Sequence, residues 1–198
     1  DHLDWYAEAG HLDRSEAMAA YAADEGRVYR HARTACVYNV AEPETERLVR
    51  DADVQEGARA IGVNLGMPAV GMLGVVDGIL VDRAFIAERQ SSAAELCTVD
   101  DLARPAPHVL ANALAAAALS RAPGISQAAV RDGLRAFRPD GHRIATVTEV
   151  RGVTWVDDSK ATNPHAALAS LLAYDPVVWI AGGLAKGARF DDLVATAR

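Results

Sequence analysis

The chain has 198 residues, of which 51% are hydrophobic and 24% charged, and its formal net charge at pH 7 is -7. This composition excludes a fibrous or disordered protein and is sufficient for one large domain or two small ones. The negative charge argues against a nucleic-acid partner, because surfaces that bind a phosphate backbone are usually basic. We therefore expect a globular protein that acts on small molecules or other proteins.

The cysteines and the apolar segments indicate the compartment. Cys36 and Cys97 each lie in apolar surroundings, with no second cysteine at the spacing of a metal site, which predicts two buried, reduced thiols. No apolar run approaches the roughly 20 residues of a membrane span, and no signal peptide opens the sequence. We expect a cytoplasmic protein. The sequence starts at Asp1 without an initiator Met, which suggests a fragment of a longer chain.

The first part of the chain alternates helical and extended patterns. These patterns predict a helix over residues 15–35, a strand over 35–39, a helix over 43–50 and a strand over 60–63. Asp77-Gly78 then predicts a hairpin between the apolar runs 70–76 and 79–85, because both central turn positions need a positive φ.

Two alanine-rich helices are expected next, one from His108 to about Ala122 and one capped by Ser126 that reaches Phe137. Arg138-Pro139-Asp140-Gly141 follows as the expected boundary between domains at residues 1–138 and 139–198. Together these elements predict an α/β protein.

The second domain is expected to contain a hairpin over 144–150 and 153–156, a helix from Pro164 and another over 190–197. Val177-Val178-Trp179-Ile180-Ala181 is a continuous apolar run, which is typical of a parallel strand buried on both faces.

Polar residues crowd the connection Asp157-Asp158-Ser159-Lys160-Ala161-Thr162-Asn163, which lies between the expected strand at 153–156 and the helix that begins at Pro164. The carboxyl end of a strand faces the crevice where α/β proteins bind ligands, so this connection is a candidate site. The alternative is an ordinary capped helix, with Thr162 or Asn163 as the cap and Lys160 in solvent.

Four other features are weaker candidates. His2 lies between Asp1 and Asp4 and could ligate a divalent cation, or be a solvated terminal residue. His108 and Asn112 are one helical turn apart and could face a cleft, where an asparagine amide can pair with adenine, or face water.

Arg143, after His142, could meet phosphates or a ribose. The glycine-rich run 182–187 includes Lys186 and could approach an anion, although it matches neither a Walker A loop nor G-x-G-x-x-G and could be a simple turn with a solvated lysine.

Taken in this order, the clusters resemble the Mur ligase family. Asp-Ser-Lys-Ala-Thr-Asn at 158–163 is similar to the members that add D-glutamate, whereas sibling ligases carry strings such as Asp-Tyr-Ala-His or Asp-Gly-Ala-His at this point. The resemblance runs over essentially the whole chain. It implies three α/β domains, of which residues 1–138 would be the second half of the central ATPase domain. Residues 139–198 would begin a Rossmann-like C-terminal domain.

The resemblance implies ATP-dependent amide formation in peptidoglycan precursor synthesis. ATP would phosphorylate the terminal carboxylate of UDP-N-acetylmuramoyl-L-alanine, and the amine of D-glutamate would displace the phosphate. ATP and Mg²⁺ are the implied cofactors, and the remainder of the same polypeptide is an implied partner.

The family's site residues carry over by motif. His2 would ligate Mg²⁺, Asn112 would contact adenine with His108 nearby, and Arg143 and Asp158 would hold ribose and phosphates. Lys160 would act in catalysis where the acceptor meets the acyl phosphate, Ser159 and Thr162 would contact substrate, and Lys186 would bind a carboxylate of D-glutamate.

Two substitutions depart from the family pattern. Glu25 occupies the position of a lysine whose carbamate serves a second metal, so it could imitate that carboxylate in catalysis and metal binding, or mark lost function. Val109 replaces the usual Asn after His108. The family's phosphate-binding loop and UDP-binding domain would precede Asp1.

We therefore expect this chain by itself to be inactive. The alternative is a non-catalytic remnant or a nucleotide-binding module. A dinucleotide-binding oxidoreductase is disfavoured, because the required glycine fingerprint followed by an acid is not found.

Overall fold

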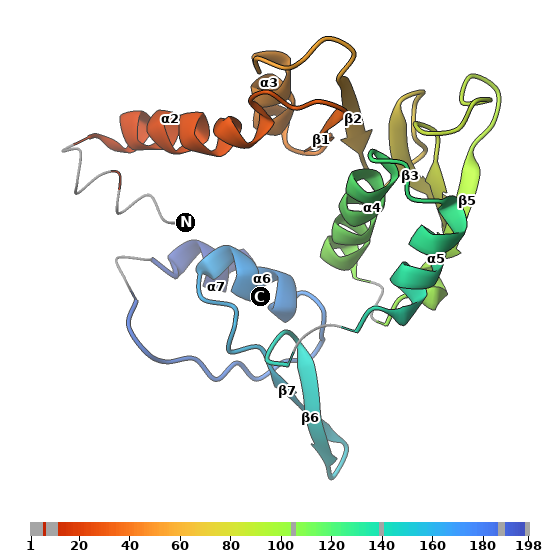
Figure 1. Ribbon diagram of the computed structural model, residues 1–198. Coiled ribbons are helices and arrows are strands. Elements are labelled where there is room, and N and C mark those ends of the chain that lie inside the picture. Colours follow the sequence, from red (N-terminus) through yellow and green to blue (C-terminus); the bar gives the residue numbers. More distant parts are fainter. Residues whose placement is uncertain (1–5, 7–11, 104–105, 139–140, 186–188, 197–198) are drawn as a thin grey trace. The chain divides into compact units, whose positions relative to one another are not determined.

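The chain divides into two compact units between Phe137 and Arg138. The computed structural model describes residues 6, 12–103, 106–138, 141–185 and 189–196 (Figure 1). We call the unit that ends at Phe137 the sheet unit and the unit that begins at Arg138 the hairpin unit. Their assignment to particular domains of a ligase stays a prediction.

Helix α2 (Arg14–Glu25) is the first described helix of the sheet unit. Asp13 caps it, and the Glu16 carboxylate accepts a hydrogen bond from the amide of Asp13, so both partners of a capping box are present. The expectation of a helix over 15–35 is wrong in its second half. Gly26, a poor helix former, opens the 3-10 turn Gly26–Tyr29, and His31 then takes a left-handed conformation with φ 57°.

A five-stranded sheet forms the centre of this unit, in the order β1-β2-β3-β4-β5. Its strands are β1 (Ala35–Asn39), β2 (Arg59–Val63), β3 (Met72–Val76), β4 (Ile79–Asp82) and β5 (Ala94–Thr98). The first three strands run parallel, and the last two are each antiparallel to their neighbour.

The expected hairpin joins β3 to β4. Asp77 has φ 49° and Gly78 has φ 75°, which confirms the turn that their sequence predicts. Strand β5 was not expected, since only Leu96 and Cys97 of its five residues are buried and its apolar pattern is short.

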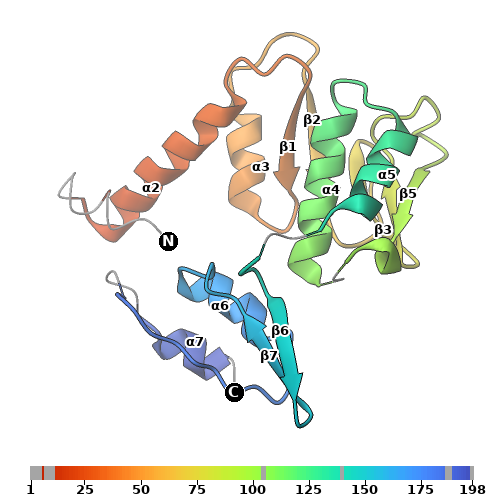
Figure 2. The same ribbon diagram turned by 60° about the horizontal axis from the view of Figure 1, so that its bottom comes forward.

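Helix α3 (Pro43–Arg50) packs on β1, α4 (Pro107–Arg121) on β1 and β2, and α5 (Gln127–Ala136) on β5. Figure 2 shows α4 and α5 beside the strands. All three helices were expected, and Ser126 does cap α5 by accepting from the amide of Ala129. The core between sheet and helices consists mainly of Ile61, Val63, Leu73, Leu80, Leu96, Leu114, Ala117, Ala118 and Val130.

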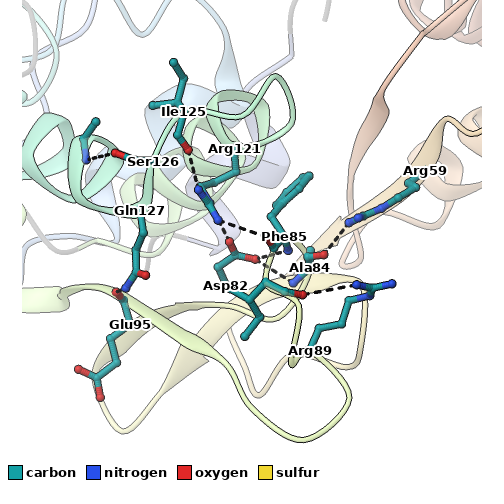
Figure 3. A network of polar contacts seen from close by, with 12 residues as sticks. Arg59, Asp82, Ala84, Phe85, Arg89, Glu95, Arg121, Ile125, Ser126 and Gln127 are labelled. Carbon is teal, nitrogen blue, oxygen red and sulfur yellow. Dashed lines mark hydrogen bonds and ion pairs between the residues drawn. The ribbon is translucent and has the colours of Figure 1, made fainter.

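A buried carboxylate lies beside this core. Asp82 is 0% exposed and accepts hydrogen bonds from the amides of Ala84 and Phe85, both at 2.8 Å, and from Nε of Arg121 at 3.0 Å (Figure 3). The Arg121 guanidinium also donates to the carbonyls of Ile125 and Phe85. Every oxygen of this carboxylate is therefore satisfied, and the pair ties β4 to the end of α4.

Both cysteines of the sheet unit are buried and free, as expected. Burial raises the pKa of the Cys36 and Cys97 thiols, so both are held in the protonated form. In the described part of the chain no helix has the length and apolar character needed to cross a membrane.

The hairpin unit contains the expected pair of antiparallel strands, β6 (Ala145–Val150) and β7 (Val153–Asp157). Helices α6 (Pro164–Leu171) and α7 (Asp191–Thr196) follow. Three buried side chains, those of Ala167, Leu171 and Leu193, join the two helices in a small cluster.

The expected buried strand over 177–181 is wrong. These residues form no strand, and their side chains are exposed, with Val178 at 91% and Ile180 at 78%. A strand needs a neighbour for its amides and carbonyls, and among the described residues of this unit β6 and β7 pair only with each other. Residues 177–181 are therefore apolar but do not join a parallel sheet.

Candidate functional site

The polar loop 157–163 links the end of β7 to the start of α6, as its sequence predicts. Asn163 is the helix cap, since its Oδ1 accepts from the amide of Ala166 at 2.8 Å, and Pro164 occupies the first helical position. Thr162 is therefore not the helix cap, and its side chain is exposed.

Asp157 fixes the start of this loop. One carboxylate oxygen accepts from the amide of Ser159 at 2.9 Å, and the other accepts from Nδ1 of His142 at 2.6 Å. The amide of Ser159, followed by the contact with His142, lowers the pKa of Asp157 to about 2. The carboxylate is thus ionised at any physiological pH.

Asp158 is half-buried and joins three segments. Its Oδ1 accepts from the amide of Ile144 at 3.0 Å, and its Oδ2 accepts from the hydroxyl of Ser170 on α6. Both oxygens are already used within the chain, so a ligand can reach this carboxylate only through the remaining lone pairs.

The backbone of the loop is closed by its own hydrogen bonds. The amide of Lys160 donates to the carbonyl of His142 at 3.1 Å, and the amide of Thr162 donates to the carbonyl of Lys160 at 2.9 Å. The side chains of Ser159, Lys160 and Thr162 are exposed. The loop is therefore ordered in its backbone and presents polar side chains to solvent.

The two neighbours of Arg143 in the sequence, His142 and Ile144, are hydrogen-bonded to the polar loop. Arg143 is exposed, and it stands between His142, with φ 65°, and Ile144, with φ 50°. Because these two neighbours are bonded to Lys160 and Asp158, the backbone of Arg143 lies beside the polar loop. Lys186 and His2 lie outside the described residues.

The remaining candidates belong to the sheet unit. His108 is half-buried and Asn112 is exposed, both in the first half of α4. Their spacing places them on one face of the helix, as expected.

Glu25 is exposed at the last position of α2. Its neighbour Tyr21, one turn earlier, has a pKa raised by burial and then by the negative charge of Glu25. Among the described residues no three His, Cys, Asp or Glu side chains gather in a group that could hold a metal ion. The described residues thus do not fit a complete magnesium site.

Three residues that are bonded to or within the polar loop have no role that the sequence predicts: His142, Asp157 and Ser170. The signal for Asp157 was its place beside Asp158, but a lone Ser six residues into a helix offers none.

Comparison with known proteins identifies relatives of the chain. No family model matches the chain. The UDP-N-acetylmuramoylalanine--D-glutamate ligase of Streptomyces avermitilis is 64% identical over 195 residues, covering 98% of this chain, and that of Streptomyces coelicolor is 63% identical over 197 residues. The chain is homologous to part of these ligases.

The homology has a definite extent. The chain spans about 40% of the length of both Streptomyces ligases, and the ligase of Leifsonia xyli is 53% identical over 197 residues, with 36% of its own length covered. The resemblance found in the sequence is thereby confirmed. The chain is related to ligases of peptidoglycan biosynthesis.

Proposed function

We propose that this chain provides part of the ATP and D-glutamate site of a cytoplasmic UDP-N-acetylmuramoylalanine--D-glutamate ligase. The observation that supports it most is the loop 157–163, a closed backbone with exposed Ser159, Lys160 and Thr162, in a chain 64% identical to such a ligase.

The reaction requires cations where phosphoryl and acyl oxygens carry charge. In the proposed function, ATP transfers its γ-phosphoryl group to the carboxylate of UDP-N-acetylmuramoyl-L-alanine. The neutral amine of D-glutamate then attacks the acyl carbon, phosphate leaves, and the amine nitrogen loses a proton. Lys160 would stabilise the oxygen charges through hydrogen bonds and electrostatics, and Arg143 would hold the phosphates and ribose of ATP.

Four further candidate residues have polar roles in this proposal. Asp158, oriented by the amide of Ile144, would accept from ribose hydroxyls through its remaining lone pairs. Ser159 and Thr162 would contact the substrates, and Lys186 would bind a carboxylate of D-glutamate.

Helix α4 would contribute to adenine recognition. The Asn112 amide offers a donor and an acceptor that match the edge of adenine, and His108 on the same helix face would line that contact. Because the described residues form no complete metal site, the proposal includes no step through magnesium.

A segment exchange tests the proposal. The 197 residues of the Streptomyces coelicolor ligase that match this chain would be replaced by this sequence, and amide formation measured as phosphate release that depends on D-glutamate. We expect D-glutamate-dependent turnover in the exchanged enzyme and none in the 198-residue chain alone. A folded exchanged enzyme without turnover, or turnover by the isolated chain, would contradict the proposal.

The alternative, a non-catalytic remnant, is favoured by one observation: an exposed glutamate, Glu25, stands at the position where the resemblance implies a carbamylated lysine. Glu25→Lys in the exchanged enzyme separates the two. If the position still serves catalysis, the lysine variant should gain activity when bicarbonate is added, since a carbamate can then form. No gain, in a folded protein, would favour the remnant.

A further inference from the structure

Two residues with unfavourable backbone conformations flank Arg143. His142 has φ 65° and Ile144 has φ 50°. A positive φ is uncommon outside glycine, and for a β-branched residue such as isoleucine it is a genuine outlier. Such conformations cost of order 1–3 kcal/mol each and persist only where the surroundings enforce them.

The polar loop provides that enforcement from both sides of Arg143. On one side, the His142 carbonyl accepts from the amide of Lys160 at 3.1 Å, and its Nδ1 donates to Asp157 at 2.6 Å. On the other side, the amide of Ile144 donates to Asp158 at 3.0 Å. Arg143 is thus held between two anchored neighbours.

The side chain of His142 cannot owe its position to burial, because it is 63% exposed. Its ring is oriented by the short contact with Asp157, whose own carboxylate is fixed by the amide of Ser159. The contact is charge-assisted, which makes it roughly twice as strong as a neutral hydrogen bond.

A second histidine shows what the same backbone conformation looks like without this anchor. His31 has φ 57°, and its Nδ1 lies 3.7 Å from Asp53, with both side chains at least 75% exposed. That separation exceeds hydrogen-bond length, and the pair belongs to the sheet unit, where His31 shortly precedes β1. The short pair at His142 is therefore not a general consequence of a left-handed histidine beside an aspartate.

We propose that His142 and Asp157 form a clamp that fixes the backbone of Arg143 beside that of Lys160, and that these two cations bind one phosphate-bearing ligand. His142 is then a positioning residue and not a proton acceptor. The phosphate-bearing ligand rests on the proposed function, whereas the clamp itself rests on the printed contacts.

Two substitutions of His142 separate positioning from proton transfer. Asparagine adopts positive φ more readily than most residues, and its side-chain amide can donate to Asp157. Alanine can do neither. In the 198-residue chain, His142→Ala should weaken the binding of inorganic tripolyphosphate about tenfold, the equivalent of one lost hydrogen bond to a charged group, whereas His142→Asn should stay within about twofold of wild type.

Hydrogen exchange supplies a readout that does not depend on a ligand. His142→Ala and Asp157→Asn should speed exchange of the Lys160 and Ile144 amides, and His142→Asn should not. His31→Ala is the matched control, since it removes a left-handed histidine beside an aspartate and should change neither binding nor exchange in the loop.

Several results would overturn the clamp. These are a wild-type chain that shows no saturable binding of tripolyphosphate, unchanged exchange in His142→Ala, or equal losses for the alanine and asparagine variants.

In the exchanged ligase, a clamp predicts that His142→Ala raises the KM for ATP with kcat little changed, and that His142→Asn restores the KM. A loss of kcat alone in both variants would identify a proton acceptor. If the exchanged ligase is inactive while tripolyphosphate binding follows the clamp, the proposed function fails and the clamp stands.

Discussion

Two carboxylates, Asp82 in the sheet unit and Asp157 in the hairpin unit, each accept from the backbone and from a basic side chain, but their surroundings are opposite. Asp82 is 0% exposed and its partner Arg121 only 12%, whereas the side chains of Asp157 and His142 are 30% and 63% exposed. The first network secures packing, since it joins β4 to α4 at the edge of the core (Figure 3). The second secures a loop whose side chains stay in water. This contrast distinguishes a structural network from one that positions a site.

The two units differ in the same way. The sheet unit has a continuous core between five strands and the helices α4 and α5, whereas the buried cluster of the hairpin unit consists of Ala167, Leu171 and Leu193. Large apolar side chains of the hairpin unit, Trp155 and Val178 among them, remain exposed. Stability therefore resides mainly in the sheet unit, and the polar loop belongs to the less stable one.

The largest expected effect comes from breaking the buried network. Asp82→Ala leaves the Arg121 guanidinium without its anion and two amides without their acceptor, which should cost about 3–5 kcal/mol of unfolding free energy. Urea unfolding of the whole chain, followed by far-UV circular dichroism, measures the loss.

The control is the ion pair of Arg135 and Asp101 at the surface, in which Nη2 of the arginine lies 3.0 Å from Oδ2 of the aspartate. Arg135→Ala should leave the unfolding midpoint close to wild type, because exposed ion pairs contribute little. An Asp82→Ala variant as stable as Arg135→Ala would show that the buried network does not secure the sheet unit.

The second effect concerns the small core of the hairpin unit. Leu193 is 4% exposed, and Leu193→Ala should cost about 2 kcal/mol, the lower end for such substitutions, because a small cluster can partly collapse onto the space. In a Trp5→Phe background the remaining tryptophans, Trp155 and Trp179, both report on this unit. Their fluorescence transition should shift to lower urea while the main circular dichroism transition stays in place. A common shift of both would mean that the units unfold together.

The sequence predicted most elements of the sheet unit because their signals are local. Asp77-Gly78 can form only a few kinds of turn, and Ser126 and Pro107 mark helix starts wherever the helices pack. The strand expected at 177–181 does not form, because an apolar strand depends on neighbours that its own residues do not specify. Strand β5 is not predicted by the sequence because its apolar pattern is short, with only Leu96 and Cys97 buried.

The candidate site was predictable only in part. Asp158, Ser159, Lys160 and Thr162 are contiguous, so their density was visible in the sequence. The bonds from Ile144 and Ser170 to Asp158 were not, since they depend on left-handed backbone angles and on where α6 packs.

The third effect uses pH to release the exposed network without touching the buried one. The pKa of Asp157 is about 2 in the folded chain, below the ordinary value of 3.8, so its contribution to stability is complete above about pH 4. It is lost as the pH falls through 2. Exchange of the Ser159 amide should therefore accelerate between pH 4 and 2, after correction for its intrinsic pH dependence.

Asp157→Asn supplies the comparison for this titration. The variant has no carboxylate to protonate at this position, so the extra acceleration should vanish while the amide retains an acceptor. An identical pH profile in wild type and variant would show that Asp157 does not hold the loop.

The smallest effect tests whether stability has been given up at a candidate functional position within the otherwise stable sheet unit. Helix α2 ends with Asp24 and Glu25 and has no basic residue in its last turn. Acidic side chains there oppose the partial negative charge of the helix C-terminus, so Glu25→Lys should stabilise the chain by about 0.3–1 kcal/mol. Glu25→Gln should give part of that gain, because it removes the charge without reversing it. Thermal unfolding at low and high salt measures both variants, and the gains should shrink as salt screens the charges.

Destabilisation by either variant would mean that Glu25 makes a favourable contact, for which Tyr21 one turn earlier is the candidate. A gain in both would place Glu25 with the exposed loop residues, as a side chain that the stability of the fold does not require.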